Sequence, residues 1–131
     1  QRERMPTHLK RSPEREAAMA NALAQIGRIK ALANAEDIPV VVVLLPDENQ
    51  INPALQDAIL DPAERDNYDF DMPQSMLREM FGEMGIPTID LLPAFRDDPR
   101  CLYMNDTHWT PEGHRLAAEH IADELRPYLP R

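Results

Sequence analysis

The chain has 131 residues, a length that fits one ordinary domain and lets about two thirds of the unfolded chain's surface become buried. Its 14 lysine and arginine residues against 23 aspartate and glutamate residues give a formal net charge of −9. That charge repels nucleic-acid phosphates and anionic lipids, so we expect no nucleic-acid partner. Hydrophobic residues make up 43% of the chain and charged residues 28%, which is typical of a globular protein and excludes a largely disordered one.

Membrane segments and disulfides are also disfavoured. The longest uninterrupted apolar run, residues 38–46, is too short to span a bilayer, so we expect no membrane segment in this chain. The single cysteine, Cys101, excludes an internal disulfide and a cysteine-built zinc site, and it leaves the compartment unknown. Because the chain opens with Gln1 rather than methionine, we expect it to be part of a longer protein.

The first predicted element is a long helix that begins after Ser12 and ends near Asn34. A serine N-cap followed by Pro13 is a common helix start. Apolar residues then recur at spacings of three and four, and Gly27 among them predicts close packing on a neighbouring element. The apolar residues on this face are Met19, Ala22, Leu23, Ile26, Ile29 and Ala33.

A buried strand is predicted over residues 40–45. Every position of this run is apolar, which is typical of a parallel strand covered on both faces by helices. The polar loop over residues 46–50 follows at the carboxyl end of that strand, where α/β sheets usually place ligands. Asp47 and Asn49 of this loop are therefore candidates for substrate binding, together with Trp109.

A short helix over residues 54–60 leads into an acidic segment, residues 61–71, which we interpret as an exposed loop. Its Tyr68 and Phe70 are candidates for contact with a partner or a sugar, although a solvated loop is the simpler interpretation. Pro73 then opens another helix, which Gly85 ends. Four methionines spaced four residues apart, from the position before this helix to its end, predict a core-facing helical stripe: Met72, Met76, Met80 and Met84.

A second strand is predicted over residues 86–91, and a short third over residues 102–104. The last helix should be capped by Thr110 and run from Pro111 to Arg126. Helix and strand alternate, as in an α/β fold. Since a parallel sheet of two or three strands is a poor independent unit, we expect missing chain or a second subunit to complete it.

Candidate catalytic residues lie in residues 103–114. In an extended segment, residues two apart point the same way, so the Asp106 carboxylate is expected to accept a hydrogen bond from the ring of His108. A carboxylate held in this way orients a histidine that acts as a general base. The simpler alternative is that Asp106 only satisfies a buried histidine, while Trp109 fills the core.

Residues 106–114, which read Asp-Thr-His-Trp-Thr-Pro-Glu-Gly-His, are followed by an Ala- and Leu-rich helix. This block resembles the last conserved block of SGNH (GDSL-type) hydrolases, in particular that of polysaccharide O-acetylation (alginate acetyltransferase-like) members. The elements before it follow a similar order, so the resemblance covers most of the chain. It implies a three-layer α/β/α sandwich with a parallel sheet. It also implies acyl transfer to water or to a sugar hydroxyl, with His108 as general base and Asp106 as its orienting acid.

The chain departs from the family at other positions. Many members place the aspartate three residues before the histidine, where this chain has Asn105, so Asp106 fits only the variant pattern. The Gly-Asp-Ser turn that carries the family's nucleophile is absent, as are the glycine and asparagine of the oxyanion hole. The two serines, Ser12 and Ser75, lie at helix starts, and Cys101 is expected to be a small buried hydrophobe.

We therefore interpret residues 1–131 as a single, partial SGNH-like domain, its C-terminal half, which lacks the strand with the serine nucleophile. Alone it should be inactive. The full-length protein is expected to be an esterase or acetyltransferase that acts on a small-molecule or glycan acyl ester without a cofactor. The resemblance also implies an extracytoplasmic location, periplasmic or secreted.

Two alternatives remain open. One is a catalytically inactive SGNH-like module, either a fragment or a natural truncation, that binds a glycan or a protein. The other is a zinc-dependent hydrolase, for which Asp106, His108 and His114 supply oxygen and nitrogen ligands within nine residues. The zinc alternative is weaker, because His114 lies in the first turn of the last helix, where its ring is expected to point away from the other two ligands.

Overall fold

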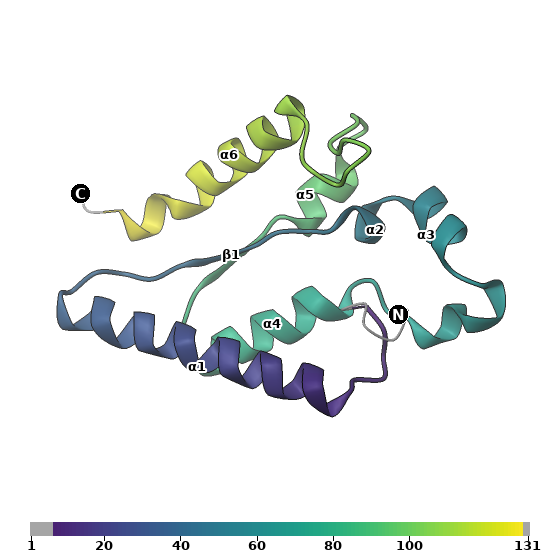
Figure 1. Cartoon of the computed structure of the whole chain (residues 1–131). Coiled ribbons are helices and arrows are strands. Elements are labelled where there is room, and N and C mark those ends of the chain that lie inside the picture. The colour runs from purple at the N-terminus through teal and green to yellow at the C-terminus, as the bar shows by residue number, and fades with distance from the viewer. Residues whose placement is uncertain (1–6, 130–131) are drawn as a thin grey trace. The chain divides into compact units, whose positions relative to one another are not determined.

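The computed structural model describes residues 7–129, which fall into two compact units (Figure 1). Of these residues, 7–41 and 61–87 form the first unit, and 42–60 and 88–129 form the second. Within the described range, none of the helices combines the length and the apolar character that crossing a bilayer requires. The predicted α/β class is confirmed, with many helices and a small parallel sheet.

The first unit contains the predicted long helix, α1 (Pro13–Ala35). The Ser12 hydroxyl accepts a hydrogen bond from the Arg15 N–H at 3.3 Å, which confirms the predicted N-cap. No α1 residue is buried, and Ile29 is 57% exposed, so the predicted apolar face is only partly covered. A Cβ at Gly27 would lie 3.6 Å from Met84 Cε, an ordinary contact. The helix therefore packs at this position as predicted, but glycine is not required for it.

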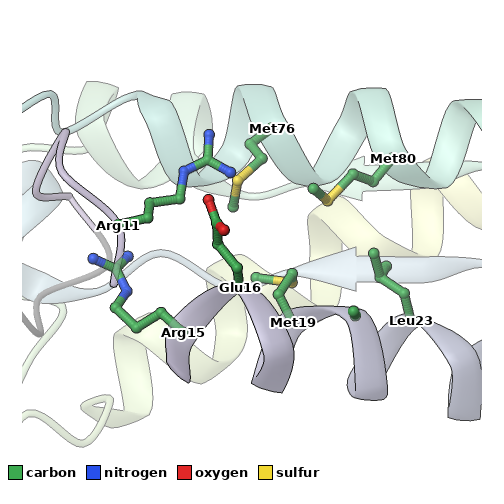
Figure 2. A pocket seen from close by; sticks show the side chains of 8 residues that line it. Arg11, Arg15, Glu16, Met19, Leu23, Met76 and Met80 are labelled. Carbon is green, nitrogen blue, oxygen red and sulfur yellow. The ribbon is translucent and has the colours of Figure 1, made fainter. Parts of the chain in front are cut away.

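Helix α4 (Met72–Glu83) packs against α1 through its methionines. Figure 2 shows Met76 and Met80 of α4 facing Met19 and Leu23 of α1. Met76 and Met80 of the predicted methionine stripe thus lie on the packed side of the helix, although all four methionines stay half-buried rather than enclosed. At the end of the helix, Gly85 adopts a φ of 63°, in the left-handed region that glycine favours.

The acidic segment is more ordered than the predicted loop. Residues Pro62–Asn67 form a 3₁₀ helix, η2, and the chain after it pairs with residues 7–9 through two backbone hydrogen bonds of 2.8 Å. Tyr68 is buried, with its ring centroid 4.8 Å from that of His8. The expected exposure of Tyr68 was wrong, because the partner segment lies about 60 residues earlier in the sequence and covers its ring.

In the second unit, β1 (Val42–Leu44) and β2 (Thr88–Asp90) pair in parallel, with Val43 opposite Ile89. Both predicted strands are therefore present, but each is only three residues long. Of β1, only Leu44 is buried, so coverage on both faces is not found among the described residues. The predicted third strand over residues 102–104 is likewise absent there, since this segment makes a single backbone bridge instead.

Five helices complete the second unit: α2 (Glu48–Ile51), α3 (Pro53–Ile59), α5 (Leu92–Asp97), α6 (Pro111–Leu125) and the 3₁₀ helix η3 (Arg126–Tyr128). The loop predicted over residues 46–50 is partly helical, because Asp47 and Gln50 form a capping box. Helix α5 was not predicted; the N–H of Leu92, its first residue, donates a hydrogen bond to the side chain of Asp90. The buried hydrophobic residues of this unit are Leu44, Leu60, Ile89, Leu91, Leu92, Phe95, Leu102, Tyr103 and Ala117.

Candidate functional site

The candidate catalytic residues lie at the tip of a tight hairpin, residues 102–110, between α5 and α6 (Figure 1). Tyr103 and Trp109 form an antiparallel bridge at its base. Nearer the tip, the Met104 N–H donates to the His108 carbonyl at 2.7 Å, and the Thr107 N–H donates to the Met104 carbonyl at 3.0 Å. The hairpin thus gives residues 105–107 the form of a turn.

This turn brings Asp106 and His108 together. His108 Nδ1 lies 3.2 Å from Asp106 Oδ2, and the His108 backbone N–H donates to Asp106 Oδ1 at 3.3 Å. The two side chains meet as expected, but for a different reason. The segment is not extended, since Thr107 has a φ of 69°, and an aspartate whose side chain accepts the N–H two residues later is typical of a turn.

Both members of the pair are open to solvent in this structure. The His108 side chain is 77% exposed and that of Asp106 is 68% exposed, so the alternative of a buried histidine is wrong. The pKa of Asp106 is lowered, first by the hydrogen bond from the His108 backbone and then by the ring itself. The carboxylate is therefore ionised at neutral pH, and Nδ1 is the ring nitrogen that faces it.

Trp109 packs beneath the hairpin. Its ring centroid lies 4.9 Å from that of Phe95 and 5.5 Å from that of His114. It is half-buried, and Gly113 of α6 packs closely against it, since a Cβ there would lie 3.1 Å from Trp109 Cβ. The tryptophan predicted to bind substrate thus contacts the core side of the hairpin.

The start of α6 holds the other side of the hairpin. The Thr110 hydroxyl accepts from the Gly113 N–H at 3.2 Å, which confirms the predicted cap. The same hydroxyl donates to the Cys101 carbonyl at 3.0 Å, and the Thr110 N–H donates to the Leu102 carbonyl at 2.9 Å. Thr110 therefore joins the helix cap to the incoming strand of the hairpin.

Tyr103 is a further residue of this region, and it was not among the predicted site residues. Its hydroxyl donates to the Pro46 carbonyl at 2.6 Å, and the residue is only 7% exposed. Burial raises the pKa of Tyr103 to about 12, although an interaction with the Trp109 side chain acts in the opposite direction. No local pattern marks this tyrosine, because its partner lies 57 positions away in the sequence.

The candidate binding residues Asp47 and Asn49 lie in the segment that Tyr103 contacts. Asp47 is the N-cap of α2 and accepts from the Asn49 N–H at 3.0 Å. The Asn49 side-chain oxygen is buried and has no hydrogen-bond partner among residues 7–129. Among residues 7–129, no hydrogen bond or ion pair joins Asp47 or Asn49 to Asp106 or His108, and the structure gives Asp47 a capping role.

Two hollows lie elsewhere. One of about 200 Å³ in the second unit is lined by polar side chains that include Arg96, Asp98 and Arg100. Arg100 donates two side-chain hydrogen bonds to Asp98, which lower the pKa of that carboxyl to about 2. The other, of about 230 Å³, is mainly apolar and lies between α1 and α4 (Figure 2). Neither of these two is lined by Asp106 or His108.

The described residues offer little support for other chemistry. No three His, Cys, Asp or Glu side chains within 7–129 lie together as metal ligands would, which weighs against the zinc alternative. Ser12 caps α1, and Ser75 lies exposed in the first turn of α4. Cys101 is exposed, and its thiol donates to the Tyr103 carbonyl, so the expectation that it would be buried was wrong.

A small parallel sheet, helices that alternate with its strands and a hairpin that presents an Asp-x-His pair together define an SGNH-like α/β domain. The model of the family described as the SGNH hydrolase-like domain of the acetyltransferase AlgX matches residues 5–130, so the chain belongs to this family. The alginate biosynthesis protein AlgX of Pseudomonas aeruginosa is 30% identical to it over 94 residues. That match covers 68% of this chain, which spans 19% of the length of the relative. No solved structure matches. The resemblance to alginate acetyltransferase-like proteins is thereby confirmed.

Proposed function

We propose that this chain is part of an SGNH-type serine esterase or O-acyltransferase, in which His108 is the general base and Asp106 orients it. The observation that carries the proposal is the 3.2 Å contact between His108 Nδ1 and Asp106 Oδ2, in a chain of the AlgX family. Because Nδ1 faces the carboxylate, Nε2 is the nitrogen that remains for a nucleophile. The ionised Asp106 stabilises the imidazolium that forms when Nε2 takes a proton.

The proposed reaction has two halves. In the first, Nε2 of His108 takes the serine hydroxyl proton as the serine oxygen attacks the ester carbonyl carbon. The tetrahedral intermediate then releases the alcohol, which leaves with that proton, and the acyl group stays on the serine. In the second half, water or a sugar hydroxyl gives its proton to Nε2 and attacks the acyl-enzyme. The serine regains the proton, and an acid or a new ester is released.

The serine itself lies outside these residues in this proposal. Ser12 is engaged as a helix cap, and Ser75 lies in the first turn of α4 rather than on a turn after a strand. The two-stranded sheet is consistent with a partial domain that further residues, or a second subunit, complete. Residues 1–131 alone are then inactive.

The substrate that we propose is an O-linked acetyl or other acyl ester, carried by a small molecule or a carbohydrate. The support is family membership and a relative whose name places it in alginate biosynthesis. An extracytoplasmic location belongs to the same proposal. The proposed reaction uses no cofactor.

A second candidate is a catalytically inactive module that binds a glycan or a protein. The observation that favours it is the exposure of both His108 and Asp106, since general bases usually act in sites that exclude water. The two candidates differ in whether His108 is needed for turnover.

The test is hydrolysis of p-nitrophenyl acetate by the full-length protein. We expect His108→Ala to lower kcat at least about 100-fold, because a general base contributes that much or more. His120→Ala is the matched control, because His120 lies on α6 outside the hairpin and should leave turnover unchanged. Equal turnover by the His108→Ala variant and the wild type would remove His108 from the mechanism and favour the binding module.

A further inference from the structure

The hairpin tip that carries the proposed base needs an anchor. Asp106 and His108 are exposed, so little packing holds them in place. The residue between them, Thr107, has a φ of 69°, a conformation that β-branched residues rarely adopt. Strained backbone of this kind persists only where the surrounding structure holds it. Hydrogen bonds within the turn hold its local shape, and the base of the hairpin ties the turn to the rest of the unit.

Tyr103 supplies the longest-range restraint at that base. Its backbone bridges to Trp109, its ring centroid lies 6.0 Å from that of Phe95, and its hydroxyl donates to the Pro46 carbonyl at 2.6 Å. Pro46 is itself buried, so its carbonyl has little access to water. The acceptor is thus shielded from water, and the Tyr103 hydroxyl is its side-chain donor.

From this geometry we infer that Tyr103 is a positioning residue of the site. Its hydroxyl fixes the hairpin that bears Asp106 and His108 to the segment that follows β1. The inference rests on the proposed function. It goes beyond that function, because neither the family match nor the Asp-x-His pattern assigns a role to this tyrosine.

Removal of the hydrogen bond from Tyr103 to Pro46 should affect the position of the hairpin more than the stability of the fold. Without the hydroxyl, the Pro46 carbonyl is left buried without this donor, and the base of the hairpin loses its link to the strand end. The ring still fills the core beside Phe95, so the fold persists. A small displacement of a general base lowers the rate of the chemical step more than it lowers substrate binding.

The experiment compares Tyr103→Phe with Tyr128→Phe in the full-length protein. Tyr128 lies in η3, is 37% exposed, and serves as the matched control. For Tyr103→Phe we expect kcat for p-nitrophenyl acetate to fall about 10-fold or more, with KM changed less than about twofold. The pH profile should keep its shape, because the hydroxyl is not an acid or base in the reaction.

Two further measurements separate positioning from folding. Hydrogen exchange at the Met104 amide, which donates to the His108 carbonyl, should be faster in Tyr103→Phe, while the melting temperature stays near that of the control. Replacement of Tyr103 by para-aminophenylalanine keeps a donor at the same place and should restore kcat. This replacement also provides the test if the phenylalanine variant does not fold, since a folded but slow para-amino protein would contradict the inference.

The outcomes distinguish this inference from the proposed function. If His108→Ala abolishes turnover while Tyr103→Phe is as fast as the wild type, the inference is wrong and the proposed function stands. If His108→Ala is fully active, the proposed function fails, and the positioning role fails with it. A parallel fall in melting temperature and in folded fraction, with unchanged kcat per folded molecule, would make Tyr103 a stability residue only.

Discussion

Gly113 lies where α6 meets the base of the hairpin that carries Asp106 and His108, and the structure predicts a cost in stability for any side chain there. A Cβ at this position would be 2.6 Å from the Leu102 carbonyl oxygen and 3.1 Å from Trp109 Cβ. The first distance is about 0.4 Å inside the shortest contact that real Cβ atoms make, and the clashing atom is backbone. Gly113→Ala therefore forces α6 or the hairpin to move.

The magnitude follows from two opposing effects. Forced displacement in a well-packed region costs about 1–3 kcal/mol, whereas alanine in place of glycine within a helix gains about 0.5–1 kcal/mol. The difference spans about 0–2.5 kcal/mol, so we expect Gly113→Ala to lower the free energy of unfolding by about 1 kcal/mol. Gly82→Ala is the matched control, because Gly82 lies in α4 and has nothing within 4 Å of the position its Cβ would take.

The assay is urea denaturation of the full-length protein and both variants, followed by far-ultraviolet circular dichroism. Gly82→Ala should unfold at the wild-type urea concentration or slightly above it, and Gly113→Ala clearly below it. The reasoning would be refuted if both substitutions changed stability equally, since helix propensity alone would then account for them. A more stable Gly113→Ala protein would show that the close approach of α6 to Leu102 does not exist.

Two further predictions concern the carboxylates. Asp106→Ala should lower kcat of the full-length protein about 10-fold or more, because His108 loses its orienting partner. The control is Asp123→Ala, which removes the exposed ion pair between Asp123 and Arg126 and should leave kcat unchanged. The pKa of Asp98 is held at about 2 by hydrogen bonds from Arg100, so Arg100→Gln should raise it toward about 3.9 in a carbon-detected NMR titration. Because the folded-state pKa is depressed, this ion pair's stabilisation is present above about pH 4 and is lost as the pH falls toward 2. An Asp98 pKa that does not move in the Arg100→Gln protein would contradict the assigned cause.

Several elements could be predicted because their signals are local. Ser12 and Thr110 cap α1 and α6 as expected, since a cap depends on a side chain and an N–H three residues later. The apolar runs that contain β1 and β2 also marked the strands and their parallel pairing. The Asp-x-His spacing likewise placed Asp106 against His108, because two residues in one turn remain close whatever the rest of the chain does.

Other features depended on residues far apart in the sequence. The length of β1 is limited by the three residues of β2 that pair with it, and Tyr68 is buried by a segment about 60 positions earlier. Residues 46–50 were predicted to be a loop, whereas the reciprocal side-chain bonds of Asp47 and Gln50 make part of this segment helical. In that case the signal was present and local.

Sequence alone thus determined the α/β class, the order of the main elements and the pair of residues on which the proposed chemistry depends. Tertiary structure decided how that pair is held: the exposure of His108 and the bond from Tyr103 to Pro46. The physical reason is that caps and turns are satisfied by neighbours within about four residues. The anchor of the hairpin, by contrast, joins atoms 57 positions apart, which only the folded chain brings within hydrogen-bonding distance.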